Sequence, residues 1–138
     1  MGRLLAIDYG TKRVGVAVSD PLQIISSPLD VVHSKDIFDF IKNYLKEEQV
    51  EAIIVGMPKK LDNTDTNNTQ SVKGFVTRLK KLIPDHPPIH FHDERFTSKI
   101  ALNAMIQAGT KKKDRQNKGN IDKVSAAVIL QSYMDSIR

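Results

Sequence analysis

The chain has 138 residues, of which 40% are apolar and 27% charged, and it contains no cysteine. This length favours a single domain over residues 1–138, and the missing cysteines exclude a disulfide scaffold, a cysteine nucleophile and a zinc site with thiolate ligands. No apolar run approaches the roughly 20 residues of a membrane span. Because no secretory signal is visible at the start, we expect a cytoplasmic protein.

The formal net charge of +5, from 21 basic and 16 acidic residues, is unevenly distributed. Residues 109–120 carry much of the excess and include only one acid, Asp114. The cations of this segment are Lys111, Lys112, Lys113, Arg115 and Lys118. We expect a flexible basic loop that contacts a polyanion, with a solvated loop without a partner as the alternative.

The first third of the chain predicts three strands. Short apolar runs at residues 4–7 and 14–18 are joined by a turn that contains Gly10, which is typical of a hairpin. A third strand is expected within residues 24–32, interrupted at Pro28. The chain therefore opens with an antiparallel arrangement.

The rest of the chain alternates between helical periodicity and strands. The expected elements are a helix at 37–45, a strand at 52–55, a helix at 72–83, a strand at 89–93, and helices at 97–108 and 121–137. Ser34 and Asn120 are the expected N-caps of the first and last of these helices. The order β-β-β-α-β-α-β-α-α predicts an α/β fold, in which a mixed five-stranded sheet carries helices on both faces.

Acidic residues stand at the ends of predicted elements. Asp8 lies where the first strand runs into a turn, and Asp93 and Glu94 end the fifth strand in the same way. Asp122 falls in the first turn predicted for the last helix. Ligands of α/β sheets bind at strand ends, so these carboxylates would converge if the two strands are parallel neighbours.

Converging carboxylates repel one another unless a cation neutralises them. Oxygen ligands favour Mg²⁺ or Mn²⁺, and one or two such ions promote phosphodiester hydrolysis. Taken singly, each acid has a simpler interpretation: Asp8 as a turn residue, Asp122 as favourable to the helix dipole, and Asp93 as a surface ion-pair partner. Their combination on this order of elements favours a metal site.

Four segments together resemble the YqgF family of small bacterial proteins. They are residues 8–17 (DYGTKRVGVA), 55–58 (VGMP), 93–97 (DERFT), and 122–127, in which Asp122 precedes Ala126 and Ala127. Members of this family are described as candidate Holliday-junction resolvases and as nucleases that mature the 5′ end of 16S ribosomal RNA. The resemblance covers essentially the whole chain.

The resemblance implies a ribonuclease-H-like fold and an endonuclease that depends on a divalent metal. Residue by residue, it assigns Asp8 and Asp122 to the first and last acidic positions, and Glu94, with Asp93 beside it, to the middle one. The choice between these two neighbours stays open, because side chains alternate along a strand but a strand end can bend. The longer side chain of Glu94 favours it as the ligand.

Cations flank the predicted site. Arg95 is placed either to clamp the scissile phosphate with its guanidinium or to pair with Asp93. Lys12 and Arg13 follow the first strand, and Lys12 is the better candidate to face substrate. The basic loop at 109–120 would hold phosphates outside the site.

The leading hypothesis is a metal-dependent endonuclease that cleaves structured nucleic acid, either precursor 16S rRNA or branched DNA. In it, Asp8, Glu94 and Asp122 hold one or two Mg²⁺ or Mn²⁺ ions. One alternative is a non-catalytic nucleic-acid-binding module of ribosome biogenesis. The other is an actin-like domain that binds phosphate or ATP, since an Asp-x-Gly-Thr hairpin also cradles phosphates in that class. The sequence leaves open whether the chain is a monomer or a homodimer.

Overall fold

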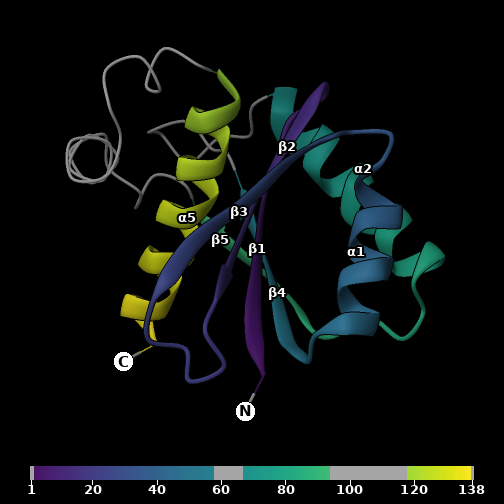
Figure 1. Cartoon of the computed structure of the whole chain (residues 1–138). Coiled ribbons are helices and arrows are strands. Elements are labelled where there is room, and N and C mark those ends of the chain that lie inside the picture. The colour runs from purple at the N-terminus through teal and green to yellow at the C-terminus, as the bar shows by residue number, and fades with distance from the viewer. Residues whose placement is uncertain (1, 58–66, 94–117, 138) are drawn as a thin grey trace.

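The computed structural model describes residues 2–57, 67–93 and 118–137. Within this part of the chain, five strands form one sheet and three helices pack on it (Figure 1). The strands are β1 (Arg3–Tyr9), β2 (Arg13–Ser19), β3 (Ser26–His33), β4 (Val50–Met57) and β5 (Ile89–Asp93). The helices are α1 (Ile37–Glu47), α2 (Asn67–Leu82) and α5 (Lys118–Ser136).

The sheet is mixed, with the strand order β3-β2-β1-β4-β5. β2 pairs antiparallel with both β1 and β3, whereas β4 pairs parallel with both β1 and β5. The carboxyl ends of the parallel strands β1, β4 and β5 therefore lie at the same end of the sheet. The predicted mixed five-stranded α/β sheet is confirmed.

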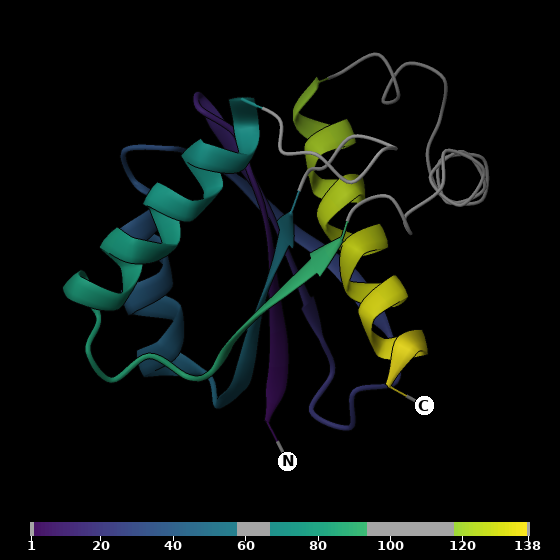
Figure 2. The same cartoon turned by 180° about the vertical axis from the view of Figure 1, so that it is seen from behind.

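Side chains of the central strands alternate between two cores. In β1, Leu5 and Ile7 pack in the core beneath α1 and α2, whereas Leu4 and Ala6 pack in the core beneath α5. Figure 2 shows α1 and α2 on one face of the sheet and α5 on the other, as predicted. Small side chains let α5 approach the sheet closely; they are Ala6, Ala17, Ala52, Ala126 and Ala127.

Both predicted N-caps are wrong. α1 begins after Asp36, which makes no side-chain capping hydrogen bond. The hydroxyl of Ser34 donates instead to the carbonyl oxygen of Thr11 and so ties the start of α1 to the β1–β2 turn. Asn120 lies inside α5, which already includes the two residues before it, and Asp122 consequently stands in the second turn of that helix.

The third strand is not interrupted at Pro28. β3 continues through this residue, and a bulge follows it, because Pro28 pairs with Ala17 while Asp30 pairs with Val16. β3 is an edge strand, where a proline removes no hydrogen bond that a further strand would need.

Two predicted segments fall partly or wholly outside the described residues. The helix predicted at 97–108 lies outside them, as does most of the basic loop predicted at 109–120. Residues 118–120, expected as the end of that loop, are helical. Among the helices that the structure describes, none has the length and apolar character needed to cross a membrane.

Candidate functional site

The carboxyl ends of the three parallel strands bring acidic positions from distant parts of the sequence to one end of the sheet. Ile7 of β1 is level with Val55 of β4, and Val55 is level with Phe91 of β5. Asp8 follows Ile7 directly, and Asp93 is the last residue of β5. β4 lies between β1 and β5, so Asp8 and Asp93 belong to strands that are not direct neighbours.

Asp8 lies on the face of the sheet that α5 covers. The alternate positions in the same strand, Leu4 and Ala6, are buried in the core beneath α5. Asp8 is half-buried. Its carboxylate therefore stands where an apolar core meets solvent.

Two glycines flank Asp8 in the sheet. Gly15 of β2 pairs directly with Asp8, and Gly56 of β4 follows Val55, the partner of Ile7. By strand alternation both glycines belong to the face that Asp8 occupies. Because neither glycine has a Cβ, neither crowds the carboxylate of Asp8 from the neighbouring strand.

His90 and His92 join β5 to α5. Both rings lie against Tyr133, with centroid distances of 6.0 and 6.2 Å, and Nε2 of His92 is hydrogen-bonded to Oγ of Ser132 at 2.8 Å. Burial lowers the pKa of His92, against the smaller opposing effect of Asp93, and so favours the neutral imidazole. The half-buried His92 packs between the end of β5 and α5, whereas His90 stays exposed beside Tyr133.

Asp93 belongs to the opposite face from Asp8. His92, one residue earlier, contacts α5, so alternation turns Asp93 toward the face where Ile89 packs beneath α1 and α2. Glu94 lies outside the described residues. The described part of the strand thus separates Asp8 and Asp93 by the thickness of the sheet.

Position 122 belongs to α5, at helical spacing from residues that pack on the sheet. Ala126 and Leu130 follow it at one and two helical turns, and both are fully buried. α5 starts at the end of the sheet toward which β1, β4 and β5 run (Figures 1 and 2). The fold therefore brings the backbone of Asp122 to the same face and the same end of the sheet as Asp8, while its side chain lies outside what the structure describes.

The predicted nucleic-acid contacts are described only in part. Lys12 and Arg13 are exposed at the turn that follows β1. Lys118 belongs to the first turn of α5. Arg95 and the cations at 111–115 lie outside the described residues.

The metal-ligand prediction is likewise described only in part. Among the described residues, no group of three or more histidine, aspartate or glutamate side chains is placed to hold an ion. Of the three predicted ligands, only Asp8 has a described side chain. The donor set still suits a hard divalent cation, because its members are all carboxylates.

The sequence did not indicate the importance of the glycines at 15 and 56 or of a pocket on the far face of the sheet. The pocket lies between the end of β1, α1 and α2, and its volume is about 450 Å³. α2 carries cations but no acid along its whole length. This charge pattern was the signal available in the sequence, and it was overshadowed by the denser basic segment at 109–120.

A protein-family model described as "Holliday junction resolvase" matches residues 2–136. The chain belongs to this family, RuvX. The resemblance to the YqgF family is thereby confirmed. The predicted class, an endonuclease that hydrolyses phosphodiester bonds, is confirmed as well.

Full-length relatives of this RuvX-family chain have closely similar sequences. A protein of Bacteroides fragilis is 51% identical over 138 residues, which cover 100% of this chain and 99% of the relative. A protein of Phocaeicola vulgatus is 53% identical over 136 residues, which cover 99% of this chain and 97% of the relative. Both are named as candidate pre-16S rRNA nucleases.

Solved structures with the same fold include known resolvases. RuvC of T. thermophilus, in complex with a Holliday junction, matches with a TM-score of 0.63 and 17% identity over 99% of this chain and 96% of that chain. The yeast mitochondrial resolvase Ydc2 matches with a TM-score of 0.58 and 12% identity over 96% and 78%. These likenesses confirm the predicted ribonuclease-H-like fold. Enzymes of this resolvase type use divalent metal ions.

Proposed function

We propose that this chain cleaves precursor 16S rRNA with the help of Mg²⁺ or Mn²⁺, at a site formed by Asp8, Glu94 and Asp122. The observation that carries the proposal is the position of Asp8, half-buried on the α5 face and flanked in the sheet by two glycines. The names of the relatives that are about half identical support the RNA substrate. Branched DNA is the competing substrate that the family description suggests.

The donor set fits one or two hard cations. Asp8 offers a carboxylate at the rim of an apolar core, and position 122 belongs to α5, at helical spacing from residues that pack on the same side of the sheet. When bound, such ions lower the pKa of water and stabilise the charge that develops on the phosphate. The carboxylates orient the ions, and the core beneath α5 limits the movement of the strand that carries Asp8.

Glu94 is our choice for the third ligand. Asp93 shares the face of Ile89, on the far side of the sheet from Asp8, whereas the next position along an extended strand would turn back toward α5. A ligand set from Asp8, Glu94 and Asp122 would then stand on one face. A set that used Asp93 would require the strand to turn over at its last residue.

Nearby cations would bind the phosphates around the scissile bond. Lys12 and Arg13 are exposed beside the end of β1, close enough along the chain to reach the backbone of a substrate bound at Asp8. We assign Arg95 to the scissile phosphate and the cations of residues 109–120 to phosphates farther away. These contacts fix the position of the substrate and do not depend on base identity.

The test compares cleavage of precursor 16S RNA and of a four-way DNA junction by the parent protein and by Asp8→Asn. Each substrate is incubated with Mg²⁺, with Mn²⁺ and with a chelator. Asp8→Asn is expected to lose at least about 100-fold in cleavage rate while it keeps its thermal stability and its substrate binding. Asp85→Asn, which removes an exposed carboxylate from the loop after α2, is the matched control and should cleave normally.

Each other outcome has a definite meaning. Full cleavage by Asp8→Asn would remove this residue from the site. Faster cleavage of the DNA junction than of the RNA would replace the substrate proposed here. Normal ribosomal RNA maturation in cells that carry Asp8→Asn would assign the chain a non-catalytic binding role.

A further inference from the structure

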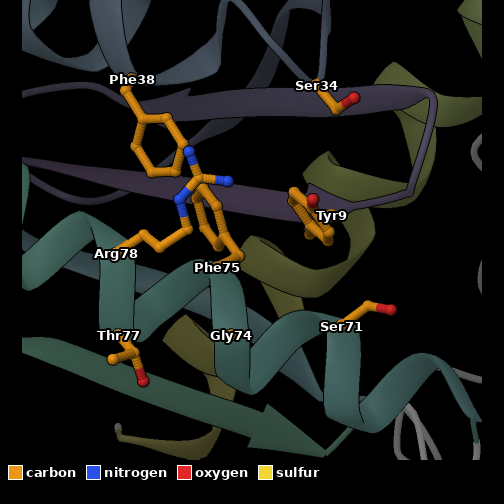
Figure 3. Close-up of a pocket in the computed structure, with 8 residues that line it drawn as sticks. All are labelled: Tyr9, Ser34, Phe38, Ser71, Gly74, Phe75, Thr77 and Arg78. Atoms are coloured by element: carbon orange, nitrogen blue, oxygen red, sulfur yellow. The ribbon is translucent and has the colours of Figure 1, made fainter.

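The pocket of about 450 Å³ lies on the face of the sheet opposite Asp8. Its walls come from three separate elements: Tyr9 ends β1, Phe38 belongs to α1, and Phe75 and Arg78 belong to α2 (Figure 3). We call it the Arg78 pocket. Its volume falls in the range typical of small-molecule sites and is large enough for one nucleotide.

One wall of the Arg78 pocket is a row of aromatic rings. The ring of Phe75 stacks on Tyr9 with a centroid distance of 4.6 Å and on Phe38 with a centroid distance of 5.4 Å. Phe75 is buried, whereas Tyr9 and Phe38 are half-buried and expose part of their surface to the pocket. The row is therefore a firm apolar platform with accessible edges at both ends.

Arg78 supplies a positive charge at one end of this platform. Its guanidinium carbon lies 5.2 Å from the centroid of the Phe38 ring, an arrangement that orients the planar group by a cation–π contact. Arg78 is exposed, and within the described part of the chain it forms no ion pair and no hydrogen bond. A fixed guanidinium whose N–H donors are not engaged is suited to a phosphate.

The surroundings of the pocket are positively charged. α2 carries the cations Lys73, Arg78, Lys80 and Lys81 and no acid. Lys12 lies at the β1 side, because its carbonyl oxygen accepts a hydrogen bond from the backbone of Ser34, which lines the pocket. The acids nearest to Phe38 in sequence are Asp36, which directly precedes α1, and Asp39 within it; both are exposed and form no ion pair with Arg78.

The Arg78 pocket adjoins the proposed cleavage site through β1. Tyr9 lines the pocket, and Asp8 precedes it in the chain with its side chain on the other face. A strand of nucleic acid that passes around the end of β1 would therefore meet both faces within a short stretch of its length. Paired nucleotides cannot offer a free base to a platform on this far face, whereas an unpaired nucleotide can.

We propose that the Arg78 pocket binds one unpaired nucleotide of the nucleic-acid substrate, with its base against the aromatic row and its phosphate on Arg78. This inference rests on the proposed function, because it assumes that the substrate is held at Asp8. Stacking on aromatic rings tolerates any base, so the pocket would select single-stranded character and not sequence. It would direct cleavage to a bond next to a single-stranded segment.

The experiment measures binding in the presence of a chelator, so that no cleavage occurs. The probes are an RNA duplex with a short unpaired tail and the same duplex with blunt ends. Arg78→Gln and Phe38→Leu should weaken binding of the tailed duplex about tenfold and leave the blunt duplex nearly unchanged. Lys80→Gln removes a cation of the same helix that does not line the pocket, and it should affect both probes equally.

A second readout detects the stacked base directly. The fluorescent base 2-aminopurine, placed in the tail, should be quenched on binding by the parent protein and by Lys80→Gln, but not by Phe38→Leu. Equal weakening of the tailed and blunt duplexes by Arg78→Gln would overturn the proposal, since Arg78 would then be one more general phosphate contact. AMP should displace the tail at concentrations at which free phosphate does not, because it offers both the base and the phosphate that the pocket would bind. Displacement by free phosphate as effective as displacement by AMP would also overturn the proposal, since the base would then make no contribution.

The proposals for the pocket and for the cleavage site can be refuted independently of each other. If Asp8→Asn cleaves normally while Arg78→Gln weakens binding of the tailed duplex and not of the blunt one, the proposed nuclease site is wrong and the pocket stands. If Asp8→Asn is inactive while Arg78→Gln binds both duplexes like the parent protein, the nuclease site stands and the pocket is wrong.

Discussion

Nε2 of His92 and Oγ of Ser132 lie 2.8 Å apart, so a hydrogen bond joins the end of β5 to the C-terminal part of α5. β5 leads directly to Glu94, and α5 carries Asp122. The contact therefore holds together the two elements that, besides β1, would supply the metal ligands. His92 and Ser132 are positioning residues in this account, because neither needs to touch the substrate.

Ser132→Ala should lower the free energy of unfolding by about 1 kcal/mol, since it leaves the part-buried imidazole of His92 without this partner. It should also reduce the cleavage rate and raise the Mg²⁺ concentration needed for half-maximal cleavage. Urea unfolding and a Mg²⁺ titration of cleavage measure the two effects.

Ser136→Ala is the control for this change. Ser136 lies on the same helix, is exposed, and donates its hydroxyl to the carbonyl oxygen of Tyr133. It should alter neither the Mg²⁺ requirement nor the cleavage rate. If Ser132→Ala behaved like Ser136→Ala in both assays, the contact would have no positioning role.

Gly15→Ala should impair cleavage more than it impairs folding. The added methyl group would stand on the face that the Asp8 carboxylate occupies, directly across the β1–β2 pair. We expect the cleavage rate to fall at least tenfold, on the order of 1.4 kcal/mol in the activation free energy. The rate should also respond less to added Mg²⁺. Cleavage at the parent rate by a folded Gly15→Ala protein would show that the space beside Asp8 is not used.

The loop between β2 and β3 should respond to acid. The backbone N–H groups of Ile25, Ile24 and Leu22 donate to the carboxylate of Asp20 and lower its pKa below the usual 3.8. Because the folded-state pKa is depressed, the ordering that this carboxylate provides is fully present above pH 3.8 and is lost as the pH falls through the lowered pKa. Amide hydrogen exchange of Ile24 and Ile25, corrected for intrinsic rates, measures this directly.

Asp20→Ala should remove the amide protection of this loop at every pH. The exposed apolar side chains that the loop presents, Leu22, Ile24 and Ile25, would then lose their fixed arrangement. Amide protection that stays constant from neutral pH to well below 3.8 in the parent protein would show that the carboxylate does not order the loop.

Binding of precursor RNA should depend steeply on salt if the segment at 109–120 holds phosphates. Five engaged cations predict a slope of about −3.5 to −4.5 in a plot of log affinity against log salt concentration. A variant with glutamine in place of the segment's cations should show a shallower slope at unchanged folding stability. An unchanged slope would exclude the segment from the interface.

The strands were predictable because their signals are local. Residues 89–93 form β5 as expected, and the apolar runs near residues 4–7 and 14–18 became β1 and β2. These segments bury continuous or alternating apolar side chains, and that pattern is visible in the sequence without knowledge of the partner strand.

The caps and the pocket were not predictable, because they depend on contacts between distant segments. The hydroxyl of Ser34 bonds to Thr11 of a different turn and not to α1, so the local capping rule chose the wrong partner. The Arg78 pocket combines Tyr9, Phe38 and Arg78 from three elements, with no regular spacing between them. Only the strand order β3-β2-β1-β4-β5 brings such residues together.

The role of the glycines beside Asp8 was predictable from the sequence only in part. Gly15 and Gly56 belong to the segments that resemble the family, but their shared role follows only from the register that places one on each side of β1. A glycine within a strand is a general signal of close approach. The sequence alone does not identify what approaches.

The most direct test compares the cleavage rates of Glu94→Gln and Asp93→Asn on precursor 16S RNA in saturating Mg²⁺, with Asp8→Asn as the inactive reference. A site on the α5 face requires Glu94→Gln to be as inactive as Asp8→Asn, while Asp93→Asn should retain most of the parent rate. Loss of cleavage in Asp93→Asn together with full activity in Glu94→Gln would contradict the account.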